Sequence, residues 1–369
     1  MKLLFFIPSL TGGGAERVLS LISNELVNRG HIISIVITDS EVSYKLNDKI
    51  VLSCIKDVRH HVVGGLLRRT IIRAGNYLRY KKKACLEINS FKPDVIITFM
   101  ESQMVPILLC HGHARIVSSE HNTMNRKFGK GIYFQRFFLN RFFDKITVLT
   151  SYDKEYAITK GLKKTVVISN PLTYNPISND VYDSLFYKRK NLLACGRINS
   201  WEVKGFDLLI KSFALLTKKD PDIELDIAGA GTDKDFAYLK EIASRFGVSE
   251  KVHFLGFRND IDYLMRIHSV FVLSSRTEGF GMVLIEAMSQ GLPCVSFALP
   301  GPREIINDGV DGLLVEEQNY DKMAESIGKM MGCEELRYRM GKNGVKNVGR
   351  FSLGTITDKW EQVFNDLVR

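Results

Sequence analysis

The stretch TEGFGMVLIEAM at residues 277–288 joins a glycine-rich turn to an apolar helix. It follows the run VFVL at 270–273, which has the composition of a buried strand. Gly279 and Gly281 allow backbone N–H groups to approach a ligand closely, and the N-terminus of the following helix favours an anion. The stretch therefore predicts a strand–turn–helix unit of a parallel α/β sheet, with an anion such as a diphosphate at the turn.

Two carboxylates accompany this turn. Glu278 lies in the turn itself, and Glu286 lies in the second turn of the helix, roughly 7 Å along its axis from Gly281. Apolar neighbours surround Glu286, so we expect its carboxylate to be buried and to need hydrogen-bonding partners. Beside a bound diphosphate, Glu278 would touch the group beyond the phosphates, and Glu286 would accept hydrogen bonds from vicinal hydroxyls such as those of ribose. The alternative for Glu286 is a solvated helix residue.

The same alternation of strand and helix extends over the whole chain. Apolar strands are predicted at 2–7, 33–38, 51–54, 94–99, 116–119, 145–149 and 166–169, and again at 192–195, 224–228, 252–255, 270–273, 294–297 and 313–315. Strands that are apolar on both faces and separated by helices predict doubly wound parallel sheets. A polar, turn-rich segment at 172–190 divides the halves. We expect two Rossmann-like domains, residues 1–172 and 190–352, facing each other across a cleft.

Composition excludes several other classes of protein. The chain has 369 residues, of which 45% are hydrophobic and 25% charged, so disordered, collagenous and coiled-coil proteins are excluded. No uncharged apolar run approaches the ~18–20 residues of a membrane span, and the N-terminus is predicted as a strand rather than a signal peptide. The six cysteines lie far apart with no C-x-x-C pair, which disfavours disulfide scaffolds and zinc ribbons and fits a reducing cytosol.

Two cations and two further glycine turns follow predicted strands. Arg197 follows the strand at 192–195, and Lys204 begins the next helix, so both are placed to bind phosphate oxygens, although an exposed basic pair is the alternative. Gly229 belongs to the turn AGAG at 228–231. The first turn, TGGGAER at 11–17, contains Gly13 and Gly14 but lacks the third glycine of a dinucleotide-binding fingerprint. An NAD-dependent enzyme therefore stays open as an alternative.

These turns together resemble the retaining glycosyltransferases of family 4, which have the GT-B fold of two facing Rossmann-like domains. The resemblance rests on GGGAE at 12–16, Gly196-Arg197, Lys204-Gly205, GAG at 229–231, and the pair Glu278 and Glu286, which has the spacing of the family's E-x7-E signature. It covers nearly the whole chain. It also implies that the last amphipathic helix, within 353–369, packs back onto the first domain.

The resemblance implies a role for each matching residue. Arg197 and Lys204 would neutralise the diphosphate of a nucleotide-sugar donor, and Glu286 would hold the ribose. His121, in SSEHN at 118–122, would lie near the transferred sugar, although a core or surface histidine is the alternative. We expect Glu278, His121, Arg197 and Lys204 to form the catalytic set. The donor-binding set is Gly13, Gly14, Arg197, Lys204, Gly229, Phe280, Gly281, Met282 and Glu286.

The resemblance further implies a chemistry that keeps the anomeric configuration and uses a UDP-sugar, carrying a hexose or N-acetylhexosamine, rather than a GDP-sugar. No Asp-x-Asp pair follows a strand as a metal-dependent transferase requires, so we expect no metal and no cofactor. A nucleotide-sugar epimerase and a catalytically silent nucleotide-sugar-binding subunit stay open beside the transferase. Nucleic-acid binding lacks a recognisable module.

The basic charge is concentrated in the first half. Residues 1–175 carry 26 Lys and Arg against 13 Asp and Glu, a net +13, whereas the rest carries 25 against 28, a net −3. Between Asp57 and Glu87 eight basic residues alternate with apolar ones, and a second basic and aromatic stretch covers 126–143. Such patterns favour an anionic membrane surface, although aromatic core residues behind a solvated rim are the alternative for the second stretch. We expect a lipid-linked surface-glycan acceptor and a cytoplasmic enzyme bound peripherally to the inner membrane face.

Overall fold

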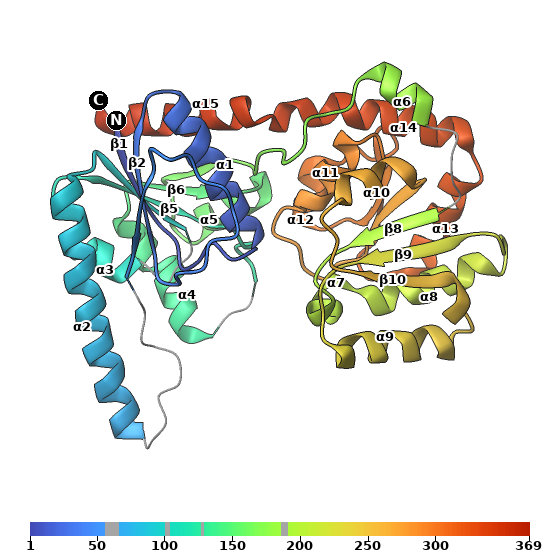
Figure 1. The fold of residues 1–369 in the computed structure, drawn as a ribbon, viewed down its shortest axis with the longest axis horizontal. Helices are drawn as coiled ribbons and strands as arrows, with labels where there is room; N and C mark the ends of the chain where they lie inside the picture. Colours follow the sequence, from blue (N-terminus) through green and yellow to red (C-terminus); the bar gives the residue numbers. More distant parts are fainter. Residues whose placement is uncertain (56–65, 100–103, 127–128, 186–190) are drawn as a thin grey trace. The chain divides into compact units, whose positions relative to one another are not determined.

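The computed structural model describes residues 1–55, 66–99, 104–126, 129–185 and 191–369, with two compact units (Figure 1). Unit 1 comprises Met1–Pro171 and Leu353–Arg369, and unit 2 comprises Leu172–Ser352. Arg59 and Lys127 of the predicted basic stretches lie outside the described residues. Among the described helices, none is both long and apolar enough to cross a membrane.

Unit 1 is built on seven parallel strands in the order β3-β2-β1-β4-β5-β6-β7. Chain order reverses between β1 and β4, and in open α/β sheets ligands bind beyond the carboxyl ends of the strands at such a point. The strands are β1 (Lys2–Phe6), β2 (Ile32–Ile37), β3 (Val51–Cys54), β4 (Val95–Phe99), β5 (Arg115–Ser119), β6 (Lys145–Val148) and β7 (Thr165–Val167).

Helices cover both faces of this sheet because its central strands are apolar on both faces. In β1, Leu4 and Phe6 pack with α2 and α3, whereas the alternate residue Phe5 meets the ring of Phe99, which stacks on Trp360 of α15. The C-terminal helix therefore belongs to the core of unit 1. The helices are α1 (Gly14–Asn28), α2 (Leu66–Phe91), α3 (Met104–Leu108), α4 (Lys130–Phe137), η2 (Leu139–Phe142), α5 (Ser151–Thr159) and α15 (Leu353–Val368).

Unit 2 has six parallel strands in the order β10-β9-β8-β11-β12-β13, so its order reverses between β8 and β11. These strands are β8 (Asn191–Cys195), β9 (Glu224–Ala228), β10 (Val252–Gly256), β11 (Val270–Leu273), β12 (Cys294–Phe297) and β13 (Gly312–Val315). Within the described residues, both sheets are parallel throughout, as the doubly wound α/β prediction requires.

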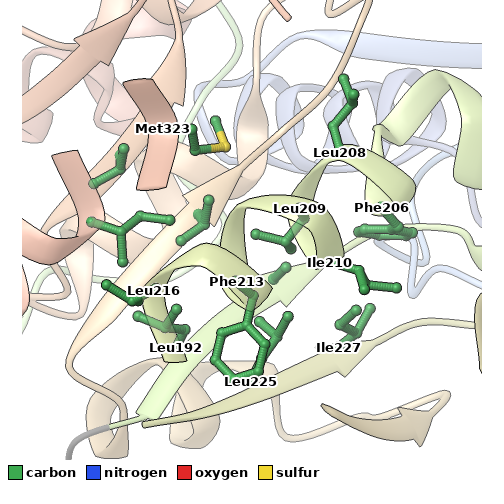
Figure 2. Close-up of a cluster of buried hydrophobic side chains, with 14 of the residues drawn as sticks. Leu192, Phe206, Leu208, Leu209, Ile210, Phe213, Leu216, Leu225, Ile227 and Met323 are labelled. Carbon is green, nitrogen blue, oxygen red and sulfur yellow. The ribbon is translucent and has the colours of Figure 1, made fainter. Parts of the chain in front are cut away.

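Side chains from β8, β9 and helix α8 form the main core of unit 2, as Figure 2 shows for Leu192, Leu225 and Phe213. This core fixes α8 against the sheet. The helices of the unit are α6 (Asn179–Leu185), η3 (Ile198–Ser200), α7 (Trp201–Lys204), α8 (Phe206–Thr217), α9 (Asp233–Arg245), η4 (Ser249–Lys251), α10 (Ile261–Ile267), α11 (Met282–Ser289), α12 (Pro300–Ile305), α13 (Tyr320–Met331), α14 (Glu334–Asn347) and η5 (Val348–Phe351).

The prediction of a turn-rich linker at 172–190 is wrong in part, because α6 lies within it. Tyr182 is buried and donates its hydroxyl proton to the backbone oxygen of Tyr338, 2.9 Å away on α14. Leu172 is also buried. The segment is polar overall, so its sequence did not indicate that Tyr182 and Leu172 are buried. The described residues of the segment belong to unit 2.

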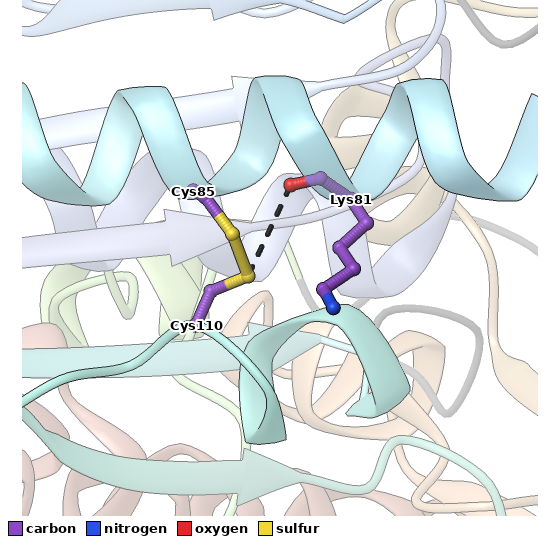
Figure 3. The surroundings of a disulfide bond; sticks show 3 residues. All are labelled: Lys81, Cys85 and Cys110. Carbon is purple, nitrogen blue, oxygen red and sulfur yellow. Dashed lines mark hydrogen bonds between the residues drawn. A yellow bond between two sulfur atoms is a disulfide. The ribbon is translucent and has the colours of Figure 1, made fainter.

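One cysteine pair also departs from the expectation. Cys85 on α2 and Cys110 after α3 form a disulfide, with their Cα atoms 5.2 Å apart (Figure 3). The Sγ atom of Cys110 lies 3.9 Å from the backbone oxygen of Lys81. The 25-residue separation of the two cysteines gave no sign of pairing, because helix packing brings them together.

Candidate active site

Lys204 and Glu278 meet where the strand order of unit 2 reverses. Lys204 ends α7 after β8, and Glu278 follows β11. Their Nζ and Oε2 atoms are 2.8 Å apart, and the side chains are 24% and 16% exposed. The hydroxyl of Ser275 also lies within 3.4 Å of Glu278 Oε2. The structure thus brings together two predicted site residues that are 74 positions apart.

Gly205 allows the backbone around Lys204 to come close to the loop after β11. Its φ is +65°, and a Cβ atom placed there would lie 1.9 Å from the backbone oxygen of Ser274. The Ser274 hydroxyl donates to the backbone oxygen of Lys204 at 2.9 Å. Both the backbone and the ammonium group of Lys204 are therefore fixed from the β11 side.

Arg197 reaches the same region by way of Gly196. A Cβ atom at Gly196 would lie 3.3 Å from Cγ of Lys204, so the start of the β8 loop rests on the lysine side chain. The Arg197 side chain itself is exposed. Its place directly after Gly196 makes Arg197 the second candidate cation for binding an anion.

Gly229 is explained by packing between loops. A Cβ atom at this position would lie 1.7 Å from the backbone oxygen of Gly196. Its own N–H is donated to the oxygen of Gly256 at 2.8 Å. The glycine holds the β9 loop against the β8 loop, and its predicted contact with a donor stays a prediction.

The N-terminus of α11 follows Glu278 directly. Gly281 is the N-cap residue, with φ +103°, and the Leu284 amide donates to its backbone oxygen at 2.8 Å. The amides of the first turn of a helix, here from Met282 onward, point away from the helix and can bind an anion. The Phe280 ring is buried against Phe351 at 5.4 Å. Phe280 can therefore offer a ligand only its backbone, and its predicted contact with the donor stays a prediction.

Glu286 is buried, with 4% of its surface exposed. Burial and then the charge of Glu286 raise the pKa of the Cys195 thiol at the end of β8. The carboxylate therefore lies close to the strand that leads into Gly196 and Arg197. Glu286 lies on α11, the helix that begins after the Glu278 turn.

A second ion pair supports the Glu278 loop and was missed by sequence reasoning. The guanidinium of Arg276 binds both carboxylate oxygens of Asp207 at 2.7 Å each and donates to the oxygen of Glu202 at 2.6 Å. The pair joins the start of α8 to the loop after β11. Its only sequence signal is the position of Arg276 two residues before Glu278.

In unit 1 the first glycine turn binds one of its own carboxylates. Glu16 accepts the N–H of Gly12 at 2.7 Å and that of Gly13 at 2.9 Å, together with the Ser9 hydroxyl. Burial opposes ionisation, but the hydrogen bonds from Gly13, Ser9 and Gly12 outweigh it and lower the pKa of Glu16. In this structure the Gly13 amide is thus occupied, and its predicted contact with phosphate, like that of Gly14, stays a prediction.

His121 follows β5 beside the carboxyl end of β4. Its ring stacks on Phe99, with centroids 4.6 Å apart, and its Nε2 atom lies 3.0 Å from the Ser119 hydroxyl. Burial lowers the pKa of His121 to about 3, so the ring is neutral at physiological pH. It is suited to donate or accept one hydrogen bond, not to supply a positive charge.

Comparison with known proteins gives the same architecture. The model of Glycosyltransferase Family 4 matches residues 12–173, and that of Glycosyl transferases group 1 matches residues 183–347. The solved Anabaena protein HepE, in complex with UDP and glucose, aligns with a TM-score of 0.80 and 20% identity over 99% of this chain and 100% of that one. The fold is that of the GT-B glycosyltransferases.

Two relatives match over nearly their full length. The Erwinia amylovora amylovoran biosynthesis glycosyltransferase AmsD is 26% identical over 99% of both chains. A Campylobacter jejuni α-1,4-N-acetyl-D-galactosaminyltransferase, named for a diNAcBac-PP-undecaprenol saccharide, is 26% identical over 98% of this chain and 97% of its own. With a Glycosyltransferase Family 4 domain over residues 12–173 and a Glycosyl transferases group 1 domain over residues 183–347, the chain is a glycosyltransferase.

Proposed function

We propose that this enzyme transfers a hexose or N-acetylhexosamine from a UDP-sugar to a lipid-linked saccharide, with retained anomeric configuration, in bacterial surface glycan biosynthesis. The proposal rests mainly on the Lys204–Glu278 ion pair next to the N-terminus of α11. The Campylobacter name supports the acceptor class, and the UDP in the HepE complex supports the donor.

The proposed reaction breaks the bond between the anomeric carbon and the donor's phosphate oxygen. The electron pair stays on that oxygen, so negative charge develops on the leaving diphosphate. Lys204, Arg197 and the first amides of α11 stabilise that charge more in the transition state than in the ground state. An acceptor hydroxyl attacks on the same face of the sugar, and its proton passes to the leaving phosphate oxygen. Glu286 holds the ribose, and Glu278 contacts the sugar.

We also propose that the reaction needs no metal ion or cofactor, because fixed cations and a helix N-terminus supply the positive charge at the diphosphate. The test is turnover after exhaustive EDTA treatment. Unchanged turnover is expected. A persistent loss that manganese restores would contradict the proposal.

The proposed acceptor is lipid-linked because unit 1 presents apolar and basic side chains to solvent. Four aromatic residues of the segment that forms α4 and η2 are 45–60% exposed. We call them the aromatic surface: Tyr133, Phe134, Phe138 and Phe142. The rings of Phe134, Phe138 and Phe142 form a row, with Phe138 4.7 Å from Phe134 and 5.7 Å from Phe142.

The neighbouring aromatic rings Phe137 and Phe143 are buried, so the stretch at 126–143 divides between core and surface. Lys82 and Lys83 on α2 are exposed, and α3 packs between α2 and η2. Exposed aromatic rings beside basic groups suit the headgroup region of an anionic membrane. We propose peripheral binding to the inner face of the membrane, tested by sedimentation with anionic vesicles at low salt. The fraction of protein bound to vesicles should fall for Phe138→Ser. Failure of the wild-type protein to bind the vesicles would contradict the proposal of membrane binding.

The donor is tested by thermal-shift measurements with UDP-glucose, UDP-galactose and their N-acetylated forms. One of them should raise the melting temperature, and the Arg197→Ala variant should lose that response. The active donor is then assayed with undecaprenyl diphosphate-linked saccharides, and the product's anomeric configuration is determined by NMR. An inverted product, or reduction of NAD without an acceptor, would overturn the proposal.

A further inference from the structure

The two ring nitrogens of His121 have different surroundings. Nε2 lies 3.0 Å from Oγ of Ser119. Nδ1 is buried and has no hydrogen-bond partner within the described part of the chain. The ring is stacked on Phe99 with an interplanar angle of 19°. One nitrogen thus has a protein partner, and the other has none among the described residues.

The hydrogen bonds behind Nε2 define where the ring proton resides. Ser119 and Thr147 are paired neighbours on β5 and β6, and both are 2% exposed. The Thr147 hydroxyl donates to Oγ of Ser119 at 2.9 Å. A hydroxyl has one proton to give, and with Ser119 accepting from Thr147, the contact through which Ser119 can donate its own proton is the one to Nε2 of His121. Nε2 is then the acceptor, and the single ring proton of neutral His121 lies on Nδ1.

No carboxylate among the described neighbours competes for this ring. The nearest one in sequence, Glu120, is 1% exposed and is bound by the Arg136 guanidinium at 3.0 Å and 3.1 Å and by the Asn140 amide at 3.0 Å. That ion pair anchors the backbone next to His121. Because Glu120 is committed elsewhere, the hydroxyl pair alone sets the protonation pattern of the ring.

We propose that Ser119 and Thr147 are positioning residues that hold His121 in its Nδ1–H tautomer, so that this N–H is reserved for an oxygen atom of the substrate. A sugar hydroxyl or carbonyl oxygen is the matching ligand chemistry. Only the identity of this ligand rests on the proposed function. The tautomer is a property of the unliganded protein.

The tautomer is measured directly by two-bond ¹H–¹⁵N correlation spectra of ¹⁵N-histidine-labelled protein. The His121 signal is assigned by its loss in His121→Asn. We expect an unprotonated Nε2 in the wild type and in Thr147→Ser, which keeps the hydroxyl. Thr147→Val and Ser119→Ala should shift the population toward the Nε2–H tautomer. Thr165→Val, a buried β7 threonine whose hydroxyl donates to Leu162, is the matched control and should leave the spectrum unchanged.

Two spectral results would overturn the proposal: a protonated Nε2 in the wild type, or an unchanged His121 pattern in both Thr147→Val and Ser119→Ala. A kinetic arm uses the sugar nucleotide that the enzyme turns over. Loss of one net hydrogen bond predicts about a fivefold fall in kcat for Thr147→Val, with donor KM unchanged and Thr147→Ser restoring the rate. If no sugar nucleotide is turned over, the proposed function fails while the spectra still decide the tautomer.

Discussion

Replacing Lys204 by methionine separates the proposed catalytic role of this lysine from its contribution to stability. Methionine keeps the aliphatic chain that packs against Gly196 but removes the ammonium group 2.8 Å from Glu278. The ion pair is partly exposed, so its loss should cost no more than about 1 kcal/mol of unfolding free energy. Removing one fixed group that stabilises a developing oxyanion typically costs about 10²–10³ in kcat, or ~3–4 kcal/mol.

The assay compares turnover and melting temperature for three variants. Lys204→Met should lose at least about 100-fold in kcat while its melting temperature falls by less than about 4 °C. Lys204→Arg, which keeps a cation, should lose less. Lys322→Met is the matched control. The Lys322 ammonium also lies 2.8 Å from a carboxylate, that of Glu325 on α13, but the Lys322 side chain is 59% exposed and is not at the switch point. Turnover of Lys204→Met near the wild-type rate would refute the reasoning.

Three further outcomes follow from the loops and the disulfide. Gly229→Ala should destabilise unit 2 by about 3 kcal/mol in urea unfolding, because its methyl group would lie 1.7 Å from a backbone oxygen. The control is Gly247→Ala, whose methyl group would meet no atom within 4 Å and which should cost only about 1 kcal/mol. Glu16→Gln should cost about 2 kcal/mol at pH 7. Since the pKa of Glu16 is lowered on folding, that difference should shrink as pH falls below 4.5, and a pH-independent difference would contradict it. Reducing Cys85–Cys110 should lower stability by about 3 kcal/mol by the loop-entropy relation, measured against Cys85→Ser, which should not respond to reductant.

The strands were predictable because each is a short run rich in apolar residues, and the central ones are buried on both faces. β3, β9, β11 and β12 have the bounds predicted from the sequence, and the others differ by one or two residues at one or both ends. Helix α6 was not predictable, because its anchor is one buried tyrosine on a polar segment. The Cys85–Cys110 contact and the Arg276–Asp207 pair depend on packing between elements far apart in sequence. Local patterns contain no information on such distances.

Glycine-rich turns follow strands in both units, but the reason for glycine differs from turn to turn. Gly205 and Gly229 are required because neighbouring backbone atoms would overlap a side chain, and Gly281 because its φ is +103°. At Gly13 the amide is already bound by Glu16. A glycine after a strand therefore indicates a close approach of backbone, and only the hydrogen bonds of its amide show whether a ligand could be bound. By that criterion, the first amides of α11 are stronger candidates for holding a diphosphate than the amide of Gly13.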